Sequence, residues 1–122
     1  MPVALDYKSD HLVVRLVGSS ILTAVRRNIV IPYSDIRRVD VESPRWPSLV
    51  KDWRIGTHWP DKIAHGLFVA WNGGNKRFLH FDGKTDRVLT LHLEGHPDFH
   101  EVSVEVREPS AAQQELSKRA GR

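Results

Sequence analysis

The chain has 122 residues, the length of one ordinary domain, and its 40% hydrophobic and 27% charged residues are close to the globular average, which excludes collagen-like and wholly disordered chains. It contains no cysteine, so disulfide frameworks, thiolate catalysis and cysteine-ligated metal sites are excluded. The formal net charge of +3 is spread over both halves of the chain, whereas nucleic-acid binders usually concentrate positive charge on one face or tail.

The first part of the chain contains short apolar runs separated by turn residues, and these predict strands, of which 11–17 alternates regularly and is expected to be half-buried. The runs are residues 11–17, 21–25, 29–31 and 36–42. Residues 32–35 predict a turn in which Ser34 or Asp35 caps one short helical turn. The charged side chains within 36–42 indicate an edge strand, because outward charges prevent pairing with other edges.

Residues 43–64 follow no regular period. They contain three prolines and the tryptophans Trp46, Trp53 and Trp59. This composition predicts a long loop, and a loop of this length is usually functional or packed down by its own side chains.

Strand patterns return after Gly66, over residues 67–71, 76–81, 87–93 and 101–107. In the last of these we expect the three valines to point inward and Glu101, Ser103, Glu105 and Arg107 to face solvent. Residues 110–120 then switch to good helix formers, with Ala112, Leu116 and Ala120 at four-residue spacing. The sequence therefore predicts a mainly β sandwich or barrel of about seven or eight antiparallel strands with a C-terminal helix at one end.

Three stretches carry a resemblance to a known family. Residues 31–39 read IPYSDIRRV, residues 56–60 read GTHWP and residues 88–95 read VLTLHLEG. The positions that accompany them are Ile63, Gly66, Phe99, Val102, Val104, Val106, Glu108 and Pro109. In this order the chain resembles the pleckstrin-homology (PH) fold, and more closely the small bacterial PH-like domain proteins, over residues 11–119.

The resemblance implies a strongly bent antiparallel sheet, or partly open barrel, of about seven strands capped by the C-terminal helix. It also implies frequent homo-oligomers, and it supplies no catalytic residues. Eukaryotic PH domains bind inositol phospholipids with basic residues of the first hairpin, but here that turn is Gly18-Ser19-Ser20. We therefore do not expect phosphoinositide binding.

The histidines are the first candidates for chemistry. His92, His96 and His100 have the four-residue spacing of a helical metal site, but Gly95 and Pro97 interrupt any helix. We expect surface histidines and no metal or other cofactor, with His92 half-exposed and His92 and His100 able to lie opposite each other across the turn.

Acid–base catalysis is a second candidate. His58, Asp61 and His65 lie near one another in sequence with Asp52 close by, and a histidine–carboxylate pair can transfer protons. No nucleophile elbow, phosphate-binding glycine loop or HExxH motif accompanies them. We expect no enzyme.

Aromatic and basic residues interleave in the long loop, where Trp46, Trp53 and Trp59 stand with Arg45, Lys51 and Arg54. This combination is typical of protein interfaces and also of single-stranded nucleic acid sites. Alternatively, the tryptophans cover an open side of the sheet. A second candidate surface is a basic edge made of Arg26, Arg27, Arg37 and Arg38, which would dock an acidic partner or a membrane unless these arginines are simply solvated.

We interpret the chain as a single non-catalytic binding or assembly module that binds itself or another protein in the cytoplasm, with no specific nucleic acid. Two other interpretations stay open: a small-molecule-binding β barrel with a histidine–aspartate site, and a weak binder of anionic membrane or nucleic acid. A barrel of that kind needs an enclosed pocket. A module should instead fill its core with Leu12, Val14, Leu16, Leu67, Val69, Leu89, Leu91, Val102, Val104 and Val106.

Overall fold

The computed structural model describes residues 3–15, 28–46, 52–59, 63–70, 76–97 and 99–121, and between residues 52 and 70 it describes the backbone and one side chain, Phe68. These residues form nine strands in two sheets and one C-terminal α-helix. The smaller sheet has the order β1 (Ala4–Tyr7), β2 (His11–Arg15), β3 (Asn28–Pro32). The predicted strands at 11–17 and 29–31 match β2 and β3, whereas the predicted strand at 21–25 lies outside the described residues.

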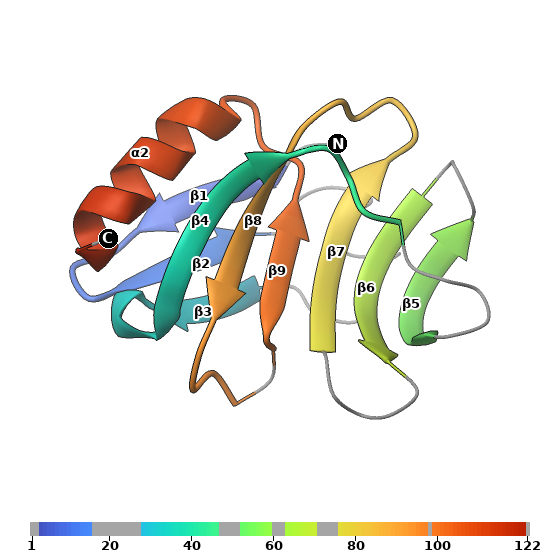
Figure 1. The fold of residues 1–122 in the computed structure, drawn as a ribbon, viewed down its shortest axis with the longest axis horizontal. Coiled ribbons are helices and arrows are strands. Elements are labelled where there is room, and N and C mark those ends of the chain that lie inside the picture. Colours follow the sequence, from blue (N-terminus) through green and yellow to red (C-terminus); the bar gives the residue numbers. More distant parts are fainter. Residues whose placement is uncertain are drawn as a thin grey trace.

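The larger sheet has six strands in the order β4-β8-β9-β7-β6-β5, seen face-on in Figure 1. In chain order they are β4 (Ile36–Glu42), β5 (Asp52–Trp59), β6 (Ile63–Ala70), β7 (Lys76–Asp82), β8 (Val88–Leu93) and β9 (Glu101–Val104). Strand β9 lies between β8 and β7 and runs parallel to β7, so the prediction of purely antiparallel pairing is wrong at this pair. The mainly β architecture with a C-terminal helix is confirmed, but the two sheets are not joined into a closed barrel.

The two sheets meet at two corners. At one corner the 3-10 turn η1 (Tyr33–Asp35) leads from β3 to β4, and the Tyr33 amide donates to the Asp10 carbonyl at 3.2 Å. At the other, the Val3 amide donates to the Glu105 carbonyl at 2.8 Å. The helical turn was predicted, but its predicted cap is wrong because Pro32 precedes the turn and no side chain caps it.

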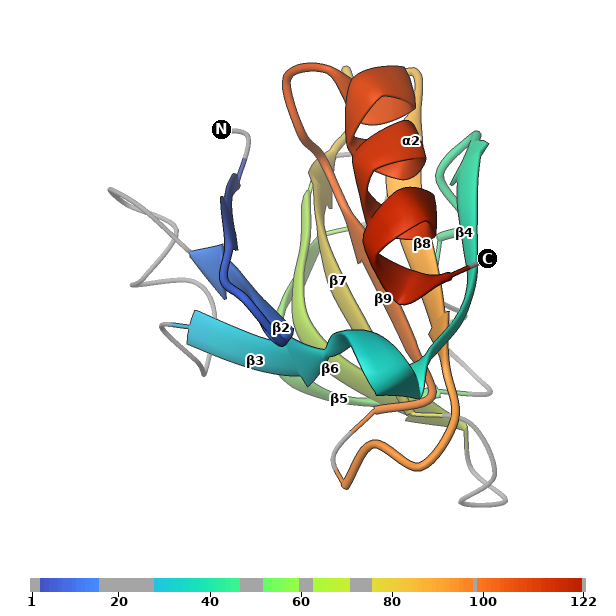
Figure 2. The same ribbon diagram turned by 90° about the vertical axis from the view of Figure 1, so that its left-hand side faces the viewer.

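The space between the sheets is filled by one hydrophobic cluster. It takes residues from the small sheet, the large sheet and the helix, which packs against β4 and β8 (Figure 2). The predicted core residues that belong to it are Leu12, Val14, Leu89, Leu91, Val102, Val104 and Val106. Leu16, and the side chains of Leu67 and Val69, lie outside the described part of the chain.

The C-terminal helix α2 (Pro109–Ala120) confirms the predicted helix. Pro109 suits the first turn because its missing N–H would have no partner there, and Gly121 ends the helix with a left-handed φ of 73°. Its apolar stripe packs as predicted: Ala112 and Leu116 are buried, and Ala120 is partly buried against the same core.

The predicted long loop over residues 43–64 is wrong in its second half, because residues 52–59 form β5 and β6 starts at Ile63. Within β5, Trp53, Ile55, Thr57 and Trp59 alternate with Asp52, Arg54, Gly56 and His58. Aromatic and β-branched residues at every second position favour a strand, and this preference outweighs the prolines and glycine that suggested a loop. Strand β1 was not predicted at all.

Strand β9 also differs from its prediction on the outward side. Glu101 and Ser103 are buried rather than exposed. The reason is that β9 is an inner strand between β8 and β7, and that Arg45 and Arg77 bind Glu101 across its outer face. Both faces of β9 are therefore covered.

Candidate functional site

A polar cluster lies on the outer face of the large sheet and centres on Glu101. The Glu101 carboxylate accepts hydrogen bonds from Arg45 and, at 2.7 Å, from Arg77, and its side chain is only 6% exposed. On the neighbouring strand, Nδ1 of His92 lies 3.6 Å from Glu101, while Nε2 lies 3.0 Å from Asp40. On the same two strands, next to His92 and Glu101, the hydroxyls of Thr90 and Ser103 share a buried hydrogen bond of 2.9 Å.

This cluster fixes the segment after β4 on the sheet. Arg77 donates to the Arg45 carbonyl at 2.7 Å, and the ring of Trp46 packs edge-on against Phe81 with centroids 5.0 Å apart. Burial alone would lower the pKa of the Arg45 guanidinium, but the charges of Glu101 and Glu42 outweigh it and raise that pKa. The charged groups therefore bind one another, and the cluster acts as a clamp within the chain.

Of the predicted tryptophan interface, the structure describes the side chains of Arg45 and Trp46. Arg45 and Trp46 contact the outer face of their own sheet. Trp53, Arg54 and Trp59 lie in β5, where their side chains are outside the description.

Of the four arginines of the predicted basic edge, the structure describes two. Arg37 pairs with Glu94 at 2.8 Å, and Arg38 pairs with Asp40 at 2.8 Å and contacts His92. Arg26 and Arg27 lie outside the described residues. The two arginines that are described therefore each carry a carboxylate partner.

The three spaced histidines do not converge. Nε2 of His96 lies 2.9 Å from the Val30 carbonyl and its ring stacks on Phe99, while Nδ1 of His100 accepts from the Lys76 amide at 3.1 Å. His92 is half-buried, and its register partner is Glu101, so His92 and His100 are not opposite each other. Within the described residues no three metal-ligating side chains gather.

The side chains of the predicted acid–base residues are not among those that the structure describes. Asp61 lies outside the described residues, and the side chains of Asp52, His58 and His65 belong to β5 and β6, which are described by their backbone.

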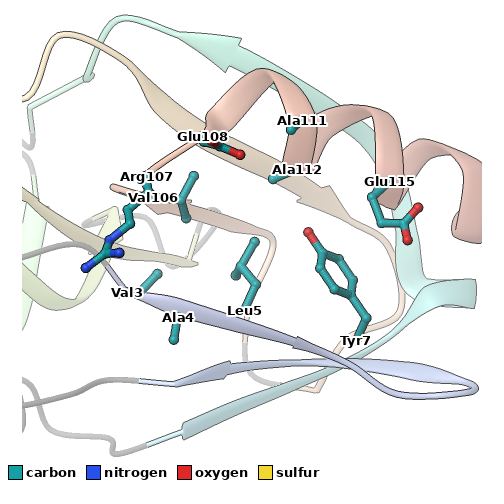
Figure 3. Close-up of a pocket in the computed structure, with 10 residues that line it drawn as sticks. All are labelled: Val3, Ala4, Leu5, Tyr7, Val106, Arg107, Glu108, Ala111, Ala112 and Glu115. Carbon is teal, nitrogen blue, oxygen red and sulfur yellow. The ribbon is translucent and has the colours of Figure 1, made fainter.

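An open groove of about 800 Å³ lies between β1 and α2 (Figure 3). One wall is β1, and the other is the start of α2 with the residues that lead into it. Its lining is mostly apolar, and consists of Val3, Ala4, Leu5, Tyr7, Val106, Arg107, Glu108, Ala111, Ala112 and Glu115. This volume lies in the range of about 300–1,000 Å³ that is typical of ligand sites.

Polar groups stand at the two ends of this β1–α2 groove. At one end Tyr7 faces Glu115, which pairs with Arg119 at 3.1 Å, and the Arg119 guanidinium lies 5.2 Å from the centroid of the Tyr7 ring. Burial, and then the Glu115 charge, raise the pKa of the Tyr7 hydroxyl. Arg107 and Glu108 stand at the other end (Figure 3).

The groove was missed in the sequence because β1 was missed. The alternation of Val3, Leu5 and Tyr7 with Ala4 and Asp6 is the signal that would have revealed it. Four residues are short for a strand pattern, however, and nothing local shows that the C-terminal helix lies beside them.

Comparison with known proteins gives no match: no family model fits the chain, and no curated protein or solved structure is similar to it. In the part of the chain that the structure describes, none of the helices has the length and apolar character that crossing a membrane requires.

Proposed function

We propose that this chain is a non-catalytic PH-like module that binds a protein partner in the β1–α2 groove. The observation that carries the proposal is the contrast between a filled core and an open, mainly apolar groove at the surface. Apolar grooves with a few polar groups at their ends are typical binding sites.

The filled core favours a module over a small-molecule barrel. Side chains from both sheets and from α2 pack into one main cluster, and a second, smaller cluster lies on the large sheet. A barrel that encloses a ligand would instead leave a cavity. The acidic and basic groups that come together, around Glu101, bind each other on the outer face. They form a structural clamp rather than a reaction site.

Charge pairing favours a protein partner over an anionic surface. Six described arginines contact a carboxylate, namely Arg15, Arg37, Arg38, Arg45, Arg77 and Arg119. Paired arginines attract phosphates less strongly than a free basic patch does.

The PH-like part of the proposal rests on the sequence motifs and on the C-terminal helix packed against two sheets. The parallel β7–β9 pair is a departure from a simple antiparallel order. We propose that the partner is a second protein, and light scattering tests the alternative that the chain associates with itself.

The class of ligand is tested by nuclear magnetic resonance on the ¹⁵N-labelled chain. Separate titrations use a pool of random octapeptides, a fatty acid mixture, anionic vesicles and single-stranded DNA. We expect the peptide pool to shift the amides of Val3, Leu5 and Ala112. Shifts at these amides with fatty acids alone, or no shift with peptides, would overturn the proposed function.

A further inference from the structure

We propose that β1 binds its partner by strand addition: an extended peptide pairs antiparallel with the free edge of β1 and ends in a free carboxylate beside Arg107. This inference rests on the proposed function, and it adds the conformation, direction and end group of the ligand.

The backbone of β1 has unused hydrogen-bonding groups on the side away from β2. The Lys8 amide donates to the His11 carbonyl on the β2 side, and the Val3 amide donates to Glu105 on the opposite side. Because successive residues of an antiparallel strand alternate in direction, the N–H and C=O groups of Leu5 and Tyr7 point away from β2. Within the described residues no backbone bond from outside the β1–β2 pair reaches Leu5 or Tyr7.

Two other sheet edges are partly occupied. On β3, His96 lies against the Val30 carbonyl, and Pro32, which has no N–H, ends the strand. On β4, the Gln113 side chain donates to the Val39 carbonyl at 2.9 Å. The fourth edge, β5, is described by its backbone. Because proteins usually protect their edges, the open stretch on β1 stands out as a place for strand addition.

The shape of the site favours a single extended chain over a second folded copy. The free edge is not on an open flank of the molecule, because α2 and residues 105–108 form a wall beside it (Figure 3). A thin peptide fits between these walls, with its alternate apolar side chains against Leu5 and Ala112. The edge strand of a second folded copy would carry its neighbouring elements with it, and these would clash with α2.

The direction of the peptide follows from the end of the groove near Val3. The Val3–Glu105 backbone bond closes this end, so an added strand has to stop there. In an antiparallel pair the C-terminus of the peptide stops at this point. Arg107 lines the same end, and no ion pair to it is present among the described residues.

A free carboxylate at this closed end complements the Arg107 guanidinium, which can hold it by a charge-assisted hydrogen bond. Glu108 lines the same end from the helix side and would instead favour the amino end of a parallel peptide. Capping one or the other end of the peptide therefore distinguishes the two directions.

The test uses fluorescent octapeptide pools in which Val or Leu alternates with random residues. One pool ends in a free carboxylate and its twin ends in an amide, and binding is measured by fluorescence polarisation. We expect amidation to weaken binding about tenfold, since a charge-assisted bond is lost. Acetylation of the amino end should change little. Arg107→Gln should weaken binding of the free-acid pool alone, and Arg37→Gln is the matched control.

The backbone pairing is tested with Leu5→Pro, which removes an N–H that β2 does not use, so the fold should persist. Its control, Leu5→Val, keeps the N–H. We expect Leu5→Pro to abolish peptide binding, and Leu5→Val to preserve it. In the wild-type chain, bound peptide should protect the Leu5 and Tyr7 amides from hydrogen exchange.

Should the peptides shift the groove amides while amidation and Leu5→Pro change nothing, strand addition is wrong and the proposed function stands. Should acetylation rather than amidation weaken binding, the direction is wrong. Should the peptides leave the groove amides unmoved, both proposals fail. If Leu5→Pro melts well below Leu5→Val, the protection of the Leu5 and Tyr7 amides decides the pairing in its place.

Discussion

Glu101 is the buried acidic residue of the described chain, and its surroundings explain how the sheet tolerates it. Two arginines and His92 surround the carboxylate. The side chain of Arg77 is itself only 12% exposed. The Arg77–Glu101 ion pair therefore has to compensate both charges for their lost contact with water. The exposed Glu94–Arg37 pair, by contrast, keeps most of its contact with water.

We therefore expect Glu101→Gln to lower the free energy of unfolding by about 3 kcal/mol, because it leaves Arg77 and Arg45 facing a neutral group. The matched change Glu94→Gln should cost less than about 0.5 kcal/mol, since exposed pairs contribute little. Urea denaturation at neutral pH measures both. Equal effects of the two substitutions would mean that the cluster is solvated and does not clamp the segment after β4.

At the scale of elements, the success of the sequence prediction depended on how local the signals were. The C-terminal helix was predicted correctly because Pro109, the spacing of Ala112 and Leu116 and the final basic residues are all within its own sequence. The inward valines of β9 were also predicted, but the burial of Glu101 was not. It depends on Arg45, which approaches from a distant part of the chain. The groove, too, arises only when β1 and α2 come together.

The helix should be essential to the fold because it supplies fully buried side chains. Leu116→Asp places a charge in the shared core and should destabilise the protein by about 2–4 kcal/mol. Gln114→Asp is the control, because Gln114 is exposed on the same helix. Thermal melting by circular dichroism compares the two. Deleting residues 109–122 without a loss of stability would contradict the role of α2 as a core element.

At the scale of the whole molecule, two sheets and one helix share one core. Leu12 comes from the small sheet, Leu89 from the large sheet and Leu116 from the helix, and all belong to one cluster. The parallel β7–β9 pair and the corner bonds connect segments that are far apart in sequence. No local pattern encodes such pairings, which is why the overall mainly β character was predicted and the parallel β7–β9 pair was not.

A shared core means that neither sheet should unfold alone, because the loss of one layer exposes the apolar face of the other. We expect the amide signals of Val14 in β2, Leu91 in β8 and Leu116 in α2 to disappear at the same urea concentration. Tyr33→Phe removes the hydroxyl that donates to the Lys8 carbonyl at 2.8 Å near the corner between the sheets. It should cost about 1 kcal/mol and lower all three midpoints together. Loss of the Val14 signal at a lower urea concentration than Leu91 would show instead that the small sheet, with its free β1 edge, opens independently of the rest.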